Sequence, residues 1–210
     1  NETIRKSGID PASPDLLLVI ASTKGNIGCY NPEEGFTADA YLHTMASRIA
    51  KAIGSINKPL VVSNACISGV SSLIVASRLL IAGKYKHILV AGGDLLSRFV
   101  TTGFASFKSL SNEVCRPYDS SHDGLSLGEA CGSLLLTTQR SEVIEPQAIS
   151  LAGGCITNDA NHISAPSRTG EGLRRAITGA MLEAGIKAED ISFVNPHGTA
   201  TLYNDEMEAK

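Results

Sequence analysis

The chain has 210 residues and a formal net charge of -3, with 18 basic side chains against 21 acidic ones. Because 43% of the residues are hydrophobic and 19% are charged, the sequence can bury a core and is too apolar for a disordered segment. It has no basic surplus for binding phosphates, which excludes nucleic acid as a default partner.

The sequence contains no apolar run that approaches the length of a membrane span. The longest, residues 16–21, is far shorter than the roughly 20 residues that cross a bilayer as a helix. No signal-peptide pattern opens the chain, and we interpret its start at Asn1 rather than Met as a processed or excised boundary. We therefore expect a cytoplasmic protein without membrane contact.

Short β-branched runs alternate with longer helical stretches, which is typical of α/β architecture. The predicted strands are residues 16–21, 60–63, 87–91, 133–138, 148–152 and 191–195. No linker and no repeat divides the chain, so we expect one continuous α/β unit.

Apolar periodicity predicts two helices between the first three strands. From Leu42 to Ile56, apolar side chains recur at three- and four-residue steps behind a Thr37 N-cap. A second helix, residues 67–82, stops at Gly83 and is apolar nearly all round, so we expect it to be buried.

A third helix is predicted to open at Thr169 and Glu171 and to close at Gly185. Its apolar residues share one face, so we expect it to be half exposed. Glycines beside the strand ends indicate turns, and none has the spacing of a phosphate or dinucleotide loop. We therefore exclude nucleotide binding.

The five cysteines are odd in number and widely spaced: Cys29, Cys66, Cys115, Cys131 and Cys155. This pattern suits neither a disulfide framework nor a zinc site. We interpret all of them except Cys66 as small buried hydrophobic residues.

Cys66 lies where a predicted strand turns directly into the second helix. Helix amide groups and the positive end of the helix dipole would stabilise a thiolate there, so we expect a pKa below the ~8.5 of an ordinary cysteine. This makes Cys66 a candidate nucleophile. On position alone, a small residue that fills a strand-helix corner is an equally open alternative.

His197 follows the apolar run of residues 191–195 and precedes Gly198, Thr199 and Thr201. Core packing explains this histidine poorly, because the glycine gives it no shielding and the hydroxyls supply polar surroundings. Surface or capping roles suffice for three other histidines, His43, His87 and His122.

Three segments together resemble the elongating β-ketoacyl-acyl-carrier-protein synthases of the thiolase-like fold. They are Asn64-Ala65-Cys66-Ile67-Ser68-Gly69; Arg116-Pro117-Tyr118-Asp119 with Asp123-Gly124 and Gly128-Glu129; and His197-Gly198-Thr199-Ala200-Thr201 with Asn204-Asp205 and Glu208. Their order and separations make the combination specific, and the resemblance runs almost the whole length of the chain.

The resemblance implies an α/β fold of two similar halves, with mixed sheets layered between helices. Cys66 would take an acyl chain from a carrier-protein thioester. His197 would help to decarboxylate a malonyl thioester, and a Claisen condensation would lengthen the chain by two carbons. Thr199, Thr201 and Ser164 would contact the pantetheine arm.

Further roles follow from the same resemblance. Asp205 and Glu208 would organise the site, and His162 matches a position at the carrier-protein entrance, with a solvent-facing loop residue as the alternative. No metal or cofactor is expected beyond the phosphopantetheine arm of the carrier. For the charged residues of the middle segment we favour a salt-bridged loop that positions its neighbours: Arg116, Asp119 and Asp123.

The resemblance also implies that residues 1–210 form one incomplete ketosynthase segment, with most of the N-terminal half and the start of the C-terminal half. In the family a lysine, a second histidine and a Gly-Phe segment lie beyond the first histidine motif, and this sequence ends at Lys210 before them. We therefore expect this chain alone not to complete the reaction.

An acyl carrier protein is the expected partner, in fatty-acid or polyketide-type synthesis, with the enzyme a homodimer or paired with a ketosynthase-like subunit. The alternative function is a non-catalytic partner subunit of the chain-length-factor type. Such subunits usually replace the nucleophile, so Cys66 favours the enzyme. A thiolase would share the fold but lack the context of His197.

Overall fold

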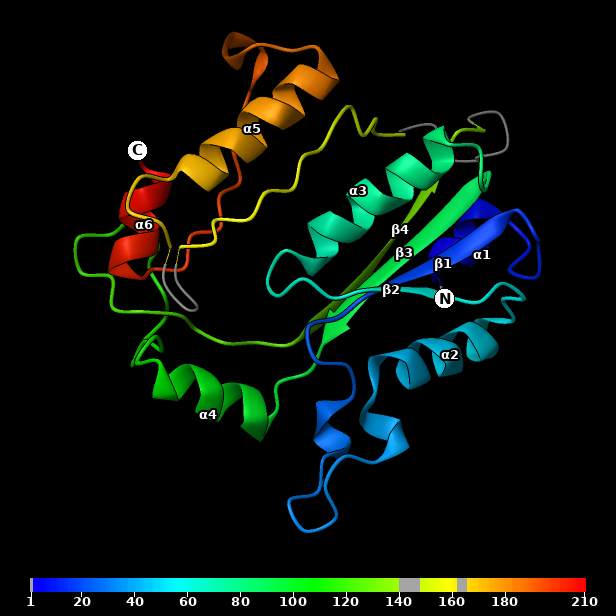
Figure 1. Cartoon of the computed structure of the whole chain (residues 1–210), viewed down its shortest axis with the longest axis horizontal. Coiled ribbons are helices and arrows are strands. Elements are labelled where there is room, and N and C mark those ends of the chain that lie inside the picture. The colour runs from blue at the N-terminus through cyan, green and yellow to red at the C-terminus, as the bar shows by residue number, and fades with distance from the viewer. Residues whose placement is uncertain (1, 140–147, 162–165) are drawn as a thin grey trace. The chain divides into compact units, whose positions relative to one another are not determined.

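The computed structural model describes residues 2–139, 148–161 and 166–210 (Figure 1). Two compact units emerge: unit 1 is Asn1–Ser97 with Glu129–Ser150, and unit 2 is Arg98–Gly128 with Leu151–Lys210. Within the described ranges, no helix is both long and apolar enough to cross a membrane.

Unit 1 is built on a four-stranded mixed sheet in the order β2-β1-β3-β4. Strand β1 (Leu16–Ala21) pairs in parallel with β2 (Leu60–Val62) and with β3 (His87–Asp94), whereas β4 (Ala130–Thr137) runs antiparallel to β3. Every residue of β1 is buried, because the strand has neighbours on both edges and helices on both faces. The first four strand predictions are confirmed, with small shifts at their ends.

Alternate residues of β1 enter two separate hydrophobic cores. On one face the buried residues come from α1 (Glu2–Ser7), the strands and α2 (Leu42–Ile53): Ile4, Leu16, Leu18, Ile20, Ala46, Ala50 and Leu89. On the other face they come from the strands and α3 (Ser68–Ile81): Leu17, Val19, Ala76, Leu80, Ile88 and Val90. The sheet of unit 1 is therefore sandwiched between helices, as Figure 1 shows.

The first two helix predictions hold in position but not in detail. The Thr37 N-cap belongs to the 3₁₀ turn η2 (Ala38–Ala40), and α2 begins after Tyr41. The predicted full burial of α3 is wrong, since Val70 and Ile81 are 59% and 74% exposed. Only one face of α3 lies on the sheet of unit 1, so its outward apolar residues remain uncovered there.

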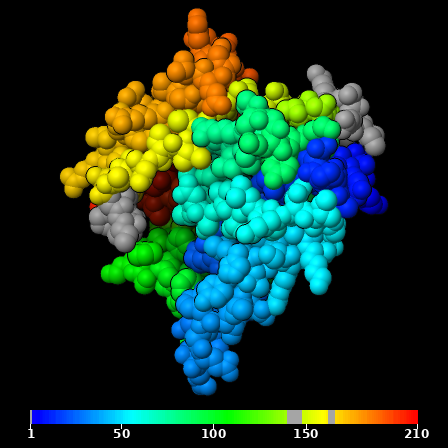
Figure 2. Space-filling view, turned by 45° about the vertical axis from the view of Figure 1, so that its right-hand side comes forward, coloured from blue at the N-terminus to red at the C-terminus, as the bar shows by residue number. Residues whose placement is uncertain are grey.

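The segment with the 3₁₀ turns η1 (Ile27–Cys29) and η2 extends away from the sheet of unit 1 (Figures 1 and 2). Its rings of Tyr30 and Phe36 contact each other, with centroids 4.8 Å apart. This contact braces the base of the narrow turn between them, where Asn31 pairs with Gly35.

Two side-chain predictions are wrong. His87 is buried rather than at the surface, because it opens a strand with neighbours on both sides, and its Nδ1 lies 2.9 Å from Thr137 Oγ1. The four cysteines expected to be core residues are not buried: Cys131 is exposed on the edge strand β4, and the others are half-buried.

Among its described residues, unit 2 contains the helices α4 (Arg98–Ser106), α5 (Glu171–Ala184) and α6 (Leu202–Glu208) and the 3₁₀ turn η4 (Ala188–Asp190). Helix α5 follows Gly170 rather than Thr169, ends at Gly185, and is half exposed as predicted.

The strands predicted at residues 148–152 and 191–195 do not form. Neither stretch pairs with another segment in the described part of the chain. Ile149 and Phe193 are 97% and 84% exposed. An apolar run becomes a strand only where a neighbour completes its hydrogen bonds, and here that neighbour is lacking among the described residues.

Candidate active site

Cys66 lies in a tight turn between β2 and α3, two residues before the helix begins. The residue before it, Ala65, has φ +46°, a left-handed conformation that is uncommon for any residue other than glycine. Cys66 itself is exposed. A strained strand-to-helix turn that leads into an exposed cysteine is the arrangement in which a nucleophile is presented to solvent.

Short-range hydrogen bonds hold this turn. Ser68 Oγ accepts a bond from the Asn64 amide at 2.8 Å and donates one to the Ala65 carbonyl at 2.6 Å. The Asn64 side-chain amide donates to Ser71 Oγ at 3.1 Å. Because Ser68 and Ser71 lie on the first turns of α3 and are buried, the helix fixes the conformation of Ala65.

A second set of bonds ties the turn to the neighbouring strand ends of unit 1. Ser63 Oγ donates to the Thr23 carbonyl at 3.2 Å, while the Asp94 carboxylate accepts the Thr23 amide at 3.1 Å and the Ser22 hydroxyl at 2.8 Å. Ser22, Ser63 and Asp94 mark the carboxyl ends of β1, β2 and β3. Cys66 thus lies at the edge of the parallel strands where open α/β sheets place their sites.

The His197 segment, residues 197–201, leads into α6 in unit 2. Gly198 and Ala200 both have φ +54°, and Ala200 is fully buried. His197 is exposed, and Thr199 and Thr201 share a hydrogen bond of 2.7 Å between their hydroxyls. Two left-handed residues in three positions make this backbone strongly bent, so it needs outside support.

Glu208 supplies much of that support. Its Oε1 accepts the His197 amide at 2.8 Å, and its Oε2 accepts the Gly198 amide at 2.9 Å, the Asn204 side chain at 3.0 Å and the Tyr118 hydroxyl at 2.7 Å. Burial alone raises the pKa of Glu208, but these hydrogen bonds outweigh it and hold the pKa below its ordinary value.

Asp205 anchors the loop of residues 116–119 to α6. It is 3% exposed, and its Oδ2 accepts the Tyr118 amide at 2.8 Å, while its Oδ1 has no hydrogen-bond partner in the part of the chain that is described. A Cβ on Gly198 would lie 3.2 Å from Pro117 Cβ. The loop therefore packs directly on the His197 segment.

Hydroxyl and amide groups, rather than the predicted salt bridges, hold the two aspartates of the middle segment. Asp119 accepts hydrogen bonds from Ser121, and Asp123 accepts one from Ser111; these bonds lower the pKa of each carboxyl. The ion pair of Arg116 is with Glu113, at 3.8 Å.

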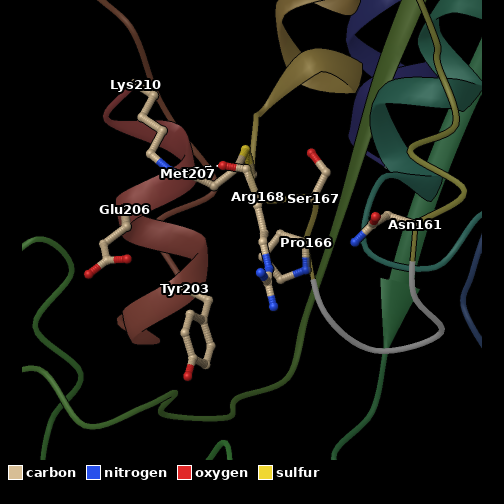
Figure 3. Close-up of a pocket in the computed structure, with 8 residues that line it drawn as sticks. All are labelled: Asn161, Pro166, Ser167, Arg168, Tyr203, Glu206, Met207 and Lys210. Atoms are coloured by element: carbon tan, nitrogen blue, oxygen red, sulfur yellow. Dashed lines mark hydrogen bonds between the residues drawn. The ribbon is translucent and has the colours of Figure 1, made fainter.

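The opposite face of α6 lines a cavity of about 440 Å³ (Figure 3). Its walls are Asn161, Pro166, Ser167, Arg168, Tyr203, Glu206, Met207 and Lys210. Lys210 Nζ donates to the Arg168 carbonyl at 2.8 Å, and Glu206 points away from the Arg168 guanidinium in Figure 3. The polar groups do not converge on one point, and no residue of the predicted site is among these walls.

The predicted site residues therefore fall into two groups. Cys66 belongs to unit 1, while Thr199, Thr201, Asp205, Glu208 and His197 belong to unit 2. Ser164 and His162 lie outside the described residues. Sequence reasoning missed the contacts of Asn64, Ser68 and Tyr118, although all three residues belong to the segments that carry the family resemblance.

Family models match both parts of the chain. The model described as the N-terminal domain of β-ketoacyl synthase matches residues 1–142, and that of the C-terminal domain matches residues 149–210.

Curated relatives agree with these matches. The 3-oxoacyl-[acyl-carrier-protein] synthase 2 of Rhizobium meliloti is 36% identical over 155 residues, which cover 67% of this chain and 36% of that protein. The protein of the same name from Synechocystis is 35% identical over 155 residues, covering 70% and 37% respectively. The chain thus matches little more than a third of each relative's length.

Solved structures show the same fold. A ketosynthase in complex with its chain length factor, from Xenorhabdus doucetiae, superposes with a TM-score of 0.80 at 29% identity, covering 99% of this chain and 53% of that one. The ishigamide ketosynthase/chain length factor superposes with a TM-score of 0.83 at 25% identity, covering 98% of this chain and 56% of that one. The α/β, thiolase-like fold is confirmed. Since one family model alone spans residues 1–142, the chain belongs to the β-ketoacyl synthase family.

Proposed function

We propose that the chain is part of a β-ketoacyl-[acyl-carrier-protein] synthase in which Cys66 is the nucleophile that accepts the acyl group. The observation that carries this proposal is the turn itself: a cysteine follows a left-handed alanine at the carboxyl end of β2 and precedes α3. In a member of this family, that turn is well suited to thioester exchange.

In the first half-reaction, Cys66 Sγ attacks the carbonyl carbon of an acyl thioester carried by an acyl carrier protein. A new carbon-sulfur bond forms, and the carrier's pantetheine sulfur leaves as a thiolate that takes up a proton. The positive end of the α3 dipole favours the attacking thiolate.

In the second half-reaction, malonyl-acyl-carrier-protein loses carbon dioxide and the bonding pair passes into an enolate. A ring N–H of His197 would donate to the enolate oxygen. The enolate carbon then attacks the acyl carbon on Cys66 and the Cys66 thiolate leaves, giving a β-ketoacyl thioester two carbons longer. Ser164, Thr199 and Thr201 would contact the pantetheine arm.

The bent backbone of residues 197–201 supports this role for His197. Glu208 accepts the amides of His197 and Gly198, and Asp205 anchors the adjacent loop. These contacts support the proposal that both carboxylates position the histidine rather than react. The lowered pKa of Glu208 keeps this residue ionised and able to accept those bonds at neutral pH.

The alternative is a partner subunit without catalytic activity. A ketosynthase bound to its chain length factor is among the similar structures, so a pairing with a related subunit is a reasonable proposal alongside a homodimer. Cys66 favours the catalytic subunit. Because the chain spans about half the length of these structures, the complete condensation is proposed for a longer polypeptide, and acyl transfer to Cys66 is the step to test here.

The test is mass spectrometry of the chain after incubation with a medium-chain acyl-acyl-carrier-protein. Wild type, Cys66→Ala and Cys131→Ala are compared, since Cys131 is another exposed cysteine of unit 1. One acyl mass on the Cys66 peptide is expected in wild type and Cys131→Ala, and none in Cys66→Ala. An acyl group that persists in Cys66→Ala would refute the assignment, and a full-length parent protein that stays unmodified would favour the partner subunit.

A further inference from the structure

Tyr118 contacts two carboxylates of α6 with two different parts of the residue. Its backbone amide donates to Asp205 Oδ2 at 2.8 Å, and its hydroxyl donates to Glu208 Oε2 at 2.7 Å. Asp205 and Glu208 are three residues apart on α6, so their side chains share one face of the helix. Tyr118 is therefore fixed at both ends by that face.

The conformation of Tyr118 depends on this arrangement. Its φ is +62°, in the left-handed region that disfavours residues other than glycine. The bond to buried Asp205 stabilises that conformation and directs the ring toward the His197 segment. A Cβ on Gly198 would lie 3.7 Å from Tyr118 Cε2, so the ring and the glycine backbone are neighbours.

The hydroxyl of Tyr118 is linked to the backbone of His197 through one carboxylate. Glu208 uses Oε1 for the His197 amide, while its Oε2 accepts both the Gly198 amide and the Tyr118 hydroxyl. Both Glu208 oxygens reach their amides only in one orientation of the carboxylate plane. The Tyr118 hydroxyl, which donates to Oε2 from the loop of residues 116–119, restricts the carboxylate to that orientation.

We propose that Tyr118 is a positioning residue for His197, whose hydroxyl orients the Glu208 carboxylate that holds the amides of residues 197 and 198. This inference rests on the proposed function, because it gives Tyr118 a purpose only if His197 acts on substrate. In this proposal Tyr118 acts through Glu208 rather than on the substrate.

Electrostatics agree with the geometry. Burial and then the hydrogen bond and charge of Glu208 raise the pKa of Tyr118 to about 12, so the hydroxyl stays protonated as a donor over the working pH range. The same bond is one of those that lower the pKa of Glu208. Glu208 thus stabilises the protonated form of Tyr118, which donates, and Tyr118 stabilises the ionised form of Glu208, which accepts.

The test compares Tyr118→Phe with Tyr203→Phe by NMR. Phenylalanine keeps the ring and the backbone strain and removes only the hydroxyl, while Tyr203 is a 70% exposed tyrosine on the other face of α6. In Tyr118→Phe, the Glu208 carboxyl should titrate at higher pH than in wild type, and the amide signals of residues 197 and 198 should shift. Tyr203→Phe should leave all three unchanged. Identical Glu208 titration in wild type and Tyr118→Phe would overturn the proposal.

A second measurement does not depend on how well Tyr118→Phe folds. In Glu208→Gln, the titration of the Tyr118 ring carbon should move from about 12 toward the ordinary value of 10. An unchanged Tyr118 titration would show that the two groups are not coupled. Neither measurement needs acyl transfer, so a failure of this proposal is distinguishable from a failure of Cys66 to accept an acyl group.

Discussion

The two turns that carry the candidate active site are stabilised in opposite ways. The Cys66 turn is held mostly by its own neighbours, since Ser68 and Ser71 bond to Asn64 and Ala65 within seven positions. The His197 segment is held by α6 and by a residue far away in the sequence, because Tyr118 and Glu208 are 90 positions apart. One strained turn is thus a local property of the chain, and the other depends on tertiary packing.

This contrast has a consequence for stability. A turn that is closed by short-range bonds forms together with its strand and helix, whereas one closed by distant residues also requires the ordering of the loop between them. We expect the His197 segment to respond more strongly to single substitutions than the Cys66 turn.

The largest expected effect is that of Glu208→Ala, which removes the acceptor for four hydrogen bonds. Because two of the donors are backbone amides in a bent segment, we expect a loss of roughly 3 kcal/mol of local stability. Hydrogen exchange should show it as faster exchange at residues 197 and 198, with the strands of unit 1 unchanged. Equal exchange rates at residues 197 and 198 in the variant and in wild type would contradict the idea that the His197 segment depends on distant contacts.

Gly198→Ala should come next. The position has φ +54°, and a Cβ there would meet Pro117 at 3.2 Å, so about 1 to 3 kcal/mol of strain is expected. The matched control is Gly103→Ala in α4, where a Cβ meets nothing within 4 Å and should stabilise the helix by about 0.5 to 1 kcal/mol. Urea unfolding measures both, and opposite signs are the expected outcome.

Ser68→Ala tests the other side of the comparison. It removes one acceptor and one donor from the Cys66 turn, and we expect a cost of about 1 to 2 kcal/mol confined to unit 1. Ser47→Ala in α2 is the control, since that hydroxyl donates to the His43 carbonyl in the preceding turn of its own helix. If exchange also accelerated at residues 197 and 198, the locality of the turn would be disproved.

The smallest effect is a pH dependence. Because the folded pKa of Glu208 is lowered, its contribution to stability is present above the unfolded pKa of about 4.5 and is lost as the pH falls through the folded value. Protection of the amides of residues 197 and 198 should therefore decrease below about pH 4.5. Glu208→Gln should remove this pH dependence, and its persistence in the variant would assign it to another group.

The part of the fold that the sequence could predict is the part with local signals. The sequence was sufficient to locate β1 and α2. A strand that is buried on both faces is a continuous apolar run, and a helix that packs on one side has apolar residues at three- and four-residue steps. The runs at residues 148–152 and 191–195 have the same apolar signal. They failed as strands because pairing depends on a neighbour that composition does not reveal.

The candidate site follows the same rule. The position of Cys66 before α3 could be predicted from the strand-turn-helix pattern, but the left-handed Ala65 that shapes the turn could not, since alanine carries no preference for that conformation. Nothing in the sequence alone pairs Tyr118 with Glu208. That contact exists only once the loop of residues 116–119 lies on α6.

The most direct test of the central claim is competitive alkylation of the cysteines with limiting iodoacetamide at neutral pH, followed by peptide mass spectrometry. Cys66 and Cys131 are both exposed and both in unit 1, so exposure alone predicts similar rates. If the turn before α3 activates the thiol, Cys66 should react about tenfold faster than Cys131. Equal rates would contradict the account and leave Cys66 as a small residue that fills a strand-helix corner.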